Sequence, residues 1–83
     1  MESRIALIGI MIEDLNASVQ VNALLHDVAD KVLCRMGFPY RSRNLHIISV
    51  ILEADGDEIS SLAGKLGQLH GVSVKTTLTS AAV

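Results

Sequence analysis

Hydrophobic side chains follow two different spacings along the chain, and these spacings predict strands alternating with helices. Residues 5–12 are a short apolar run, rich in isoleucine and bounded by charged residues, which favours a buried strand over a helix. Residues 45–53 form a second run of the same kind. Residues 31–37 and 72–77 alternate apolar with polar side chains, as expected for strands exposed on one side.

The first helix is predicted between the first two strands. Apolar side chains recur at helical spacing from Ala17 to Val28, so we expect a helix that starts there and ends near Asp30. Asp14 or Asn16 is placed to cap its first turn, because short polar side chains accept hydrogen bonds from the free amides at a helix start.

The boundary between this helix and the next strand is ambiguous, because helical spacing can be extended to Val32. The following segment favours a strand over 31–37. Residues 38–44 (FPYRSRN) indicate a turn-like connection in which Pro39 bars a helix, so strand, turn and strand is the simplest interpretation.

The second helix follows the third strand. Apolar side chains recur at helical spacing between Ile59 and Leu69, with Asp55 or Asp57 as the cap. Gly71 is expected at the C′ position just beyond the helix. Residues 79–83 are expected to form a frayed tail.

The predicted elements follow the order βαββαβ, which is that of the ferredoxin-like fold. We therefore expect one α+β domain over residues 1–83, with a four-stranded antiparallel sheet in the order 4-1-3-2 and two helices on one face. This order places the first and third strands in the middle of the sheet, and these two are apolar at nearly every position. The edge strands instead carry Lys31, Arg35 and Lys75.

The two central strands are apolar on both faces, although two helices cover only one face of a sheet. The uniformly aliphatic set is assigned to the helix side: Ile8, Ile10, Ile12, Ile48, Val50 and Leu52. The other side then holds Leu7, Gly9, Met11, Ile47, Ser49 and Ile51. Exposing that side to water would forfeit on the order of several kcal/mol, comparable to the whole stability of a small domain. We therefore expect these residues to form an oligomer interface.

Length and composition support the same expectation. A chain of 83 residues is enough for one small domain, and such a domain buries only ~60% of the surface that its unfolded chain exposes. With 49% hydrophobic residues, the chain is too apolar to stay disordered. The single cysteine, Cys34, excludes an internal disulfide, so we expect added stability from a second subunit and a reducing, cytoplasmic location.

Charge and hydropathy argue against two kinds of partner. The net charge of -2 provides no basic field for a nucleic-acid backbone or an anionic membrane surface. The apolar run at 5–12 is far shorter than the ~20 residues needed to span a bilayer. We therefore expect neither direct nucleic-acid binding nor membrane association.

Candidate chemistry is sparse. His26, His46 and His70 lie in different predicted elements and lack the spacing of a metal site on one helix or strand. Cys34 is interpreted as a small apolar core residue rather than a nucleophile. Neither a catalytic triad order nor a phosphate-binding glycine loop can be argued, so we expect no catalytic residues, no cofactor and no metal.

Two segments carry a resemblance to a known family: VNALLHDVADKVLCRMGFPYRSRNLHIISVIL (21–52) and LAGKLGQLHGVSVKT (62–76). The chain resembles the ACT-like regulatory domains, and more closely a family of short proteins described as regulators of the iron-only hydrogenase system. The resemblance covers nearly all residues from 4 to 77. It implies a regulatory homo-oligomer, a dimer or tetramer, that senses a small molecule, a metal or a partner protein.

The resemblance also implies a place for an effector. ACT domains commonly hold amino acids against the turn between the first strand and the first helix, on an acidic residue followed by a glycine. Asp14 matches the acidic residue, whereas Asn16 and Ala17 stand where the glycine would be. The ligand-binding candidates are Asp14, Leu15, Asn16 and Ala17, with an amino acid as an example of the effector. The alternative is a structural interaction module that binds no small molecule.

Overall fold

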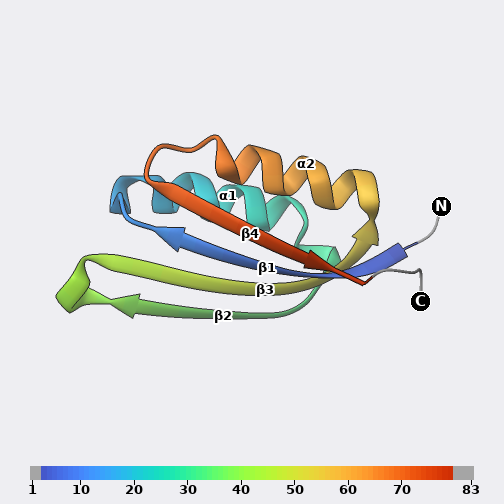
Figure 1. The fold of residues 1–83 in the computed structure, drawn as a ribbon, viewed down its shortest axis with the longest axis horizontal. Coiled ribbons are helices and arrows are strands. Elements are labelled where there is room, and N and C mark those ends of the chain that lie inside the picture. Colours follow the sequence, from blue (N-terminus) through green and yellow to red (C-terminus); the bar gives the residue numbers. More distant parts are fainter. Residues whose placement is uncertain (1–2, 80–83) are drawn as a thin grey trace.

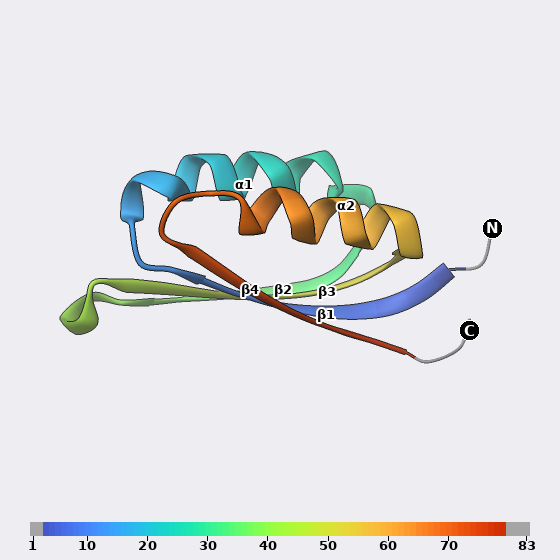
Figure 2. The same ribbon diagram turned by 45° about the horizontal axis from the view of Figure 1, so that its top comes forward.

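Four strands and two α-helices follow the order βαββαβ in the computed structural model, which describes residues 3–79. The strands are β1 (Ser3–Ile12), β2 (Val32–Tyr40), β3 (Leu45–Asp55) and β4 (Val72–Leu78). The helices are α1 (Ser18–Asp27) and α2 (Gly56–Gly67), and three short 3-10 helices lie in the connections: η1 (Leu15–Ala17), η2 (Ala29–Lys31) and η3 (Arg41–Arg43). Both α-helices lie on one side of the sheet (Figure 1 and Figure 2).

The sheet is antiparallel throughout, with the strand order β2-β3-β1-β4. Read from the other edge, this is the order 4-1-3-2, so the predicted ferredoxin-like fold is confirmed. Gly9 of β1 pairs with both Ser49 of β3 and Lys75 of β4, and Ser49 in turn pairs with Met36 of β2. These pairs define a row of residues that crosses all four strands.

The hydrophobic core lies between the sheet and the two helices. The six residues that the sequence assigns to the helix side are all at most 1% exposed, which confirms the assignment. The helices complete the core with Val21 and Leu25 of α1 and with Ile59, Leu62 and Leu66 of α2. No polar or charged side chain is buried within residues 3–79, so this side is held by apolar packing.

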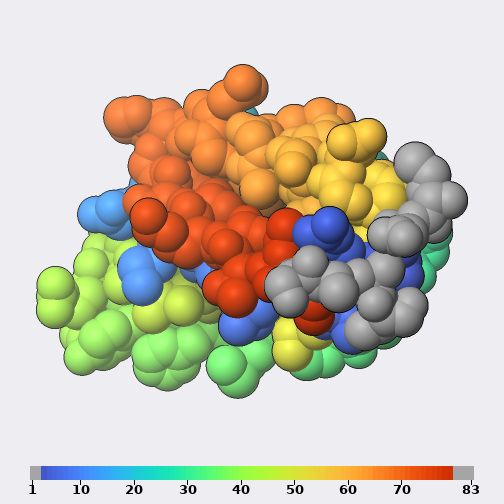
Figure 3. Space-filling view, turned by 45° about the vertical axis from the view of Figure 1, so that its right-hand side comes forward, coloured from blue at the N-terminus to red at the C-terminus, as the bar shows by residue number. Residues whose placement is uncertain are grey.

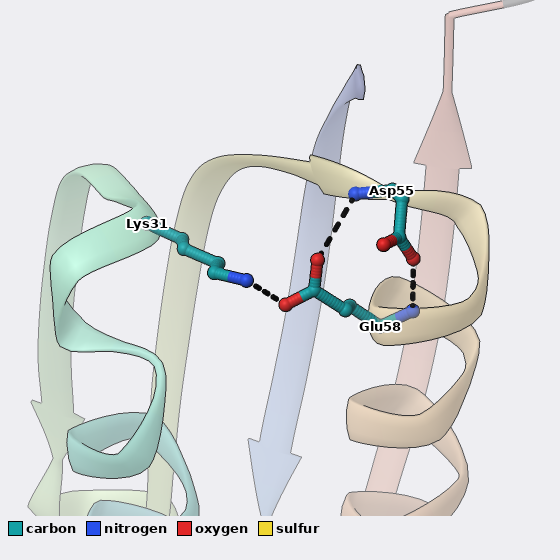
Figure 4. A network of polar contacts seen from close by, with 3 residues as sticks. All are labelled: Lys31, Asp55 and Glu58. Carbon is teal, nitrogen blue, oxygen red and sulfur yellow. Dashed lines mark hydrogen bonds and ion pairs between the residues drawn. The ribbon is translucent and has the colours of Figure 1, made fainter. Parts of the chain in front are cut away.

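A polar network of three residues holds the start of α2 (Figure 4). The Asp55 carboxylate accepts a hydrogen bond from the amide of Glu58 at 2.8 Å, and the Glu58 carboxylate accepts one from the amide of Asp55 at 3.5 Å. This reciprocal pair is a capping box, and of the two predicted caps Asp55 is the correct one. Glu58 also forms an ion pair with Lys31 of η2, which joins the start of α2 to the beginning of β2.

The predicted turn between β2 and β3 is too long. The sequence predicts a turn over 38–44, but β2 continues through Tyr40 and the turn begins at Arg41. Pro39 is tolerated because β2 is an edge strand, the place in a sheet where proline is accommodated. Asn44 closes the turn with φ 53, in the left-handed region. The hairpin tip projects past the helices (Figure 1).

The ends of both helices also differ from the prediction. α1 ends at Asp27, and η2 replaces its last predicted turn. α2 ends at Gly67, so Gly71 is not the C′ residue. Gly71 instead has φ +75, and its carbonyl accepts a hydrogen bond from the amide of Glu13 at 2.7 Å. A Cβ at Gly71 would lie 2.4 Å from the Cβ of Asp14, so only glycine permits this contact between the two loops.

Only part of the predicted frayed tail, residues 79–83, belongs to the residues that the structure describes. Residues 80–83 lie outside the described residues. Thr79 is described, and its amide donates a hydrogen bond to the carbonyl of Ile5 at 3.1 Å. Fraying of Thr79 stays a prediction.

Candidate functional site

The helices leave one face of the sheet uncovered, and we call it the open face (Figure 2). Paired residues on neighbouring antiparallel strands share a face, so the strand register assigns its members. The open face consists of Ile5, Leu7, Gly9 and Met11 of β1, Leu45, Ile47, Ser49, Ile51 and Glu53 of β3, Cys34, Met36, Phe38 and Tyr40 of β2, and Ser73, Lys75 and Thr77 of β4. Among these residues, Glu53 and Lys75 alone carry a charge.

Large apolar side chains on the open face are exposed. Met36 is 66% exposed, Phe38 53%, Met11 49% and Leu7 46%. Phe38 also packs against Tyr40, with the ring centroids 5.6 Å apart. In Figure 3, side chains of β4 (red), β1 (blue) and the β2–β3 hairpin (green) come together on one surface. A large contiguous apolar patch is rare on a monomeric protein, so the open face is a candidate interaction surface.

A hollow of about 300 Å³ lies in the open face at Gly9. Met11, Ile47 and Lys75 are among the residues that line it. Gly9 has no side chain to fill this space, whereas the neighbouring residues of β1 on the open face, Leu7 and Met11, are large. An apolar hollow among projecting side chains is suited to receive a side chain from another subunit.

The six interface residues predicted from the sequence all lie on the open face, which confirms their place on the uncovered side. Their contact with another subunit stays a prediction. Sequence reasoning missed the contribution of β2, which adds Cys34, Met36, Phe38 and Tyr40. Their spacing of two residues was the available signal, but the predicted strand end at Gly37 cut it short. Cys34 is exposed, so its interpretation as a core residue is wrong, because it faces away from the helices.

The predicted ligand-binding residues form η1 and its cap. The Asp14 carboxylate accepts a hydrogen bond from the amide of Asn16 at 3.0 Å, and the Asp14 carbonyl accepts one from the amide of Ala17 at 2.9 Å. Ala17 is buried, whereas Leu15 and Asn16 are exposed. Two amides that an anionic ligand would use are therefore already bonded. The cap of η1 is sufficient to explain the position of the Asp14 side chain. Ligand binding at this loop stays a prediction.

A metal centre and a membrane-spanning helix are two other kinds of functional feature. Within residues 3–79, no group of three His, Cys, Asp or Glu side chains is placed to hold a metal ion. The helices in that part of the chain are too short or too polar to cross a membrane.

Comparison with known proteins identifies the family. The family described as "TM1266-like: Iron-only hydrogenase system regulator, putative" matches residues 4–76. The chain belongs to this family. A solved structure, the uncharacterized protein TM1266 from Thermotoga maritima, is 42% identical in a match that covers 93% of this chain and 98% of that chain, with a TM-score of 0.89. The family resemblance found in the sequence is thereby confirmed.

Two other solved structures share the fold with this family member. A formyltetrahydrofolate deformylase from Pseudomonas putida KT2440 is 16% identical over 88% of this chain and 28% of that chain, with a TM-score of 0.65. An unknown protein from Galdieria sulphuraria is 17% identical over 99% of this chain and 48% of that chain, with a TM-score of 0.64. At these identities the likeness shows the fold alone. A comparison with curated proteins gives no match.

Proposed function

We propose that the protein is a non-enzymatic regulator of an iron-only hydrogenase system and works as a homo-oligomer assembled through the open face. Membership of the regulator family supports the regulatory role. The proposal of an assembly rests on one observation, which is that large apolar side chains are exposed on one side of the sheet: Leu7, Met11, Met36 and Phe38. Burying these side chains against a partner removes apolar area from water and stabilises the assembled state.

The size of the open face suits a stable dimer. Strands at a spacing of ~4.8 Å, each contributing about nine residues at ~3.3 Å, give a four-stranded sheet a flat area of roughly 550 Å². Projecting side chains make the accessible area larger than this flat area. A specific interface buries about 800 Å² on each partner. One additional subunit on the open face therefore provides an interface of ordinary size.

A second copy of the chain fits the open face because each copy offers two complementary features. The side chains of Met36 and Phe38 project from β2, and the hollow at Gly9 lies near the opposite edge of the sheet. In a two-fold pair, every contact is made twice, with the features exchanged between the copies. Projecting side chains of one copy can then enter the hollow of the other.

Light scattering tests the assembly. At micromolar concentration, the wild type is expected to have a mass of two or four chains of 8.9 kDa. Replacing Leu7→Glu or Ile47→Lys should give monomers of low stability, because the new charge would have to be buried without a partner. Val19→Glu is the matched control, since Val19 is an exposed apolar residue of α1, away from the open face, and its replacement should leave the mass unchanged. A stable wild-type monomer would refute the proposal.

The proposed regulatory role includes the sensing of a small molecule. The family resemblance supports an effector such as an amino acid, with Asp14, Leu15, Asn16 and Ala17 as the first candidates for its site. A thermal-shift screen of amino acids, nucleotides, folates and divalent metals separates a sensor from a module that only assembles. A ligand present at a hundred times its Kd stabilises the native state by ~2.7 kcal/mol. The absence of any response would favour the interaction module.

A further inference from the structure

A groove of about 410 Å³ lies between α1 and β2 on the helix side of the sheet, and we call it the α1–β2 groove. Its volume falls within the range of small-molecule sites. Leu25 and Val50 are buried and form its apolar floor, whereas Asn22, His26 and Arg35 are exposed at its rim. An apolar floor with a few polar groups at one side is the composition of a site for an amphiphilic small molecule.

Charge is distributed unequally between the two grooves beside α1. A second groove, of about 310 Å³, lies between α1 and α2. It is lined by three carboxylates, those of Asp27, Asp57 and Glu58, and by the ammonium of Lys65, and Glu58 is also paired with Lys31. Carboxylates therefore still outnumber the cations beside them. No carboxylate lines the α1–β2 groove, where the charged group is the guanidinium of Arg35. An anion is therefore favoured on the β2 side of α1 and disfavoured on the α2 side.

The register of β2 places Arg35 over this groove. Arg35 pairs with Val50, which is buried on the helix side, so both side chains point to that side. The guanidinium donates a hydrogen bond to Oδ1 of Asn22 on α1, which holds it across the groove. Within the described residues the ion pair present joins Lys31 to Glu58, so Arg35 meets no carboxylate in that part of the chain. A guanidinium has five N–H donors in a planar fork that matches a carboxylate.

We propose that the α1–β2 groove binds a small monocarboxylate with an apolar body, such as a branched-chain amino acid or the corresponding 2-oxo acid. The carboxylate forms a bidentate pair with Arg35, and the apolar body lies on Leu25 and Val32. The imidazole of His26 adds a further donor at the rim. This inference rests on the proposed regulatory role, because it names the site and the chemical class of the effector.

The α1–β2 groove is compatible with assembly through the open face. It lies on the helix side, so a second copy on the open face leaves it accessible to solvent. It is also next to the interface, because Arg35 and Met36 are successive residues of β2 that point to opposite faces. A ligand held by Arg35 therefore acts on the strand that contributes Met36 and Phe38 to the open face.

Isothermal titration calorimetry of the wild-type protein tests the ligand class. The probes 4-methyl-2-oxopentanoate and leucine carry both a carboxylate and an apolar body. Acetate lacks the body, and 4-methylpentan-1-ol lacks the carboxylate. We expect at least one of the complete probes to bind, and each of the truncated probes to bind about tenfold more weakly or worse. Equal binding of the alcohol would overturn the proposal, as would the absence of heat with both complete probes at millimolar concentration.

Variants of the rim test the role of Arg35. Arg35→Gln should weaken binding of the complete probe by about tenfold or more, and Arg35→Lys by less, because lysine keeps the charge but loses the bidentate geometry. Arg41→Gln is the matched control: it removes the same charge from the hairpin turn and should leave the affinity within about twofold. Equal affinity of the wild type and Arg35→Gln, with circular dichroism showing both folded, would refute the site.

The mass from light scattering is read independently of these titrations. An oligomer that binds neither complete probe contradicts the groove and leaves the proposed assembly intact. A monomer that binds them through Arg35 contradicts the assembly and leaves the groove intact.

Discussion

The two faces of the sheet are built from alternate residues of the same strands, yet they have different surroundings. On the covered face, Ile8 and Ile10 are fully buried, whereas on the open face Leu7 and Met11 of the same strand are almost half exposed. Both sets are large and apolar, so the difference comes from the helix layer and not from the residue types. The hydrophobic pattern therefore predicts that both faces need cover, and the structure shows the cover of one face, which is the helix layer.

The largest effect is expected on the covered face. Ile10→Ala should lower the free energy of unfolding by about 2–5 kcal/mol, because it removes buried methyl groups and leaves a cavity between the sheet and the helices. Urea denaturation followed by circular dichroism measures this change. The loss should be the same at every protein concentration, since the side chain lies inside one subunit. Val19→Ala on the exposed side of α1 is the control and should change stability by less than about 0.5 kcal/mol.

A smaller effect with a different signature is expected on the open face. Leu7→Ala should destabilise the assembled protein by about 2 kcal/mol, because part of the Leu7 surface is buried only when a second copy is bound. The midpoint of thermal unfolding should rise with protein concentration for the wild type and lie lower for the variant. A wild-type midpoint that is independent of concentration would contradict the predicted interface, because the open face would then be stable in water without a partner.

The hollow at Gly9 allows a test of the open face at a single position. A Cβ at Gly9 would meet its nearest neighbour, the carbonyl oxygen of Lys75, at 4.0 Å, so the subunit itself accommodates a larger residue. Gly9→Val should therefore leave the circular dichroism spectrum unchanged. It should weaken association by about 1–2 kcal/mol, because it fills space that a partner side chain is expected to occupy. Sedimentation equilibrium measures the dissociation constant, and an unchanged value would exclude the hollow from the interface.

The smallest effect is expected away from both faces, at the loop that precedes α1. The double replacement Asp14→Ala and Asn16→Ala should cost about 1 kcal/mol of stability, because it removes the cap of η1. The affinity for 4-methyl-2-oxopentanoate should stay unchanged, since the α1–β2 groove does not include this loop. Calorimetry decides between the two candidate sites. A loss of binding free energy greater than the loss of folding free energy would move the effector to Asp14 and Asn16.

The order of elements and the two faces of the central strands were predictable from the sequence. Alternate residues of a strand point to opposite faces, so the runs at 5–12 and 45–53 report directly which side chains share a side. The length of β2 was not predictable in the same way. Pro39 and the polar residues after it favour a turn, and they are accommodated in a strand only because β2 is at the edge of the sheet. That position depends on tertiary structure.

The other features that the sequence did not predict depend on contacts between segments far apart in the chain. The role of Gly71 depends on its approach to Asp14 across two loops that are far apart in sequence. The α1–β2 groove depends on Arg35 and Asn22, which belong to different elements and meet only when α1 packs on the sheet. The residues that β1 and β3 contribute to the open face were predictable, because they follow from local alternation. The groove was not, because no local spacing relates its two sides.

The hydrogen bond between Thr79 and Ile5 has a mechanical consequence. β1 and β4 are antiparallel neighbours, and their paired ends lie where the described chain begins and finishes. A force that pulls these two ends apart acts along the hydrogen bonds between β1 and β4, because such bonds run perpendicular to the strands. The bonds would then break one after another, as in the opening of a zipper, and not all at once as in sliding of the strands. A fold with a fully apolar core is thus expected to yield to a small force when it is pulled by its two ends.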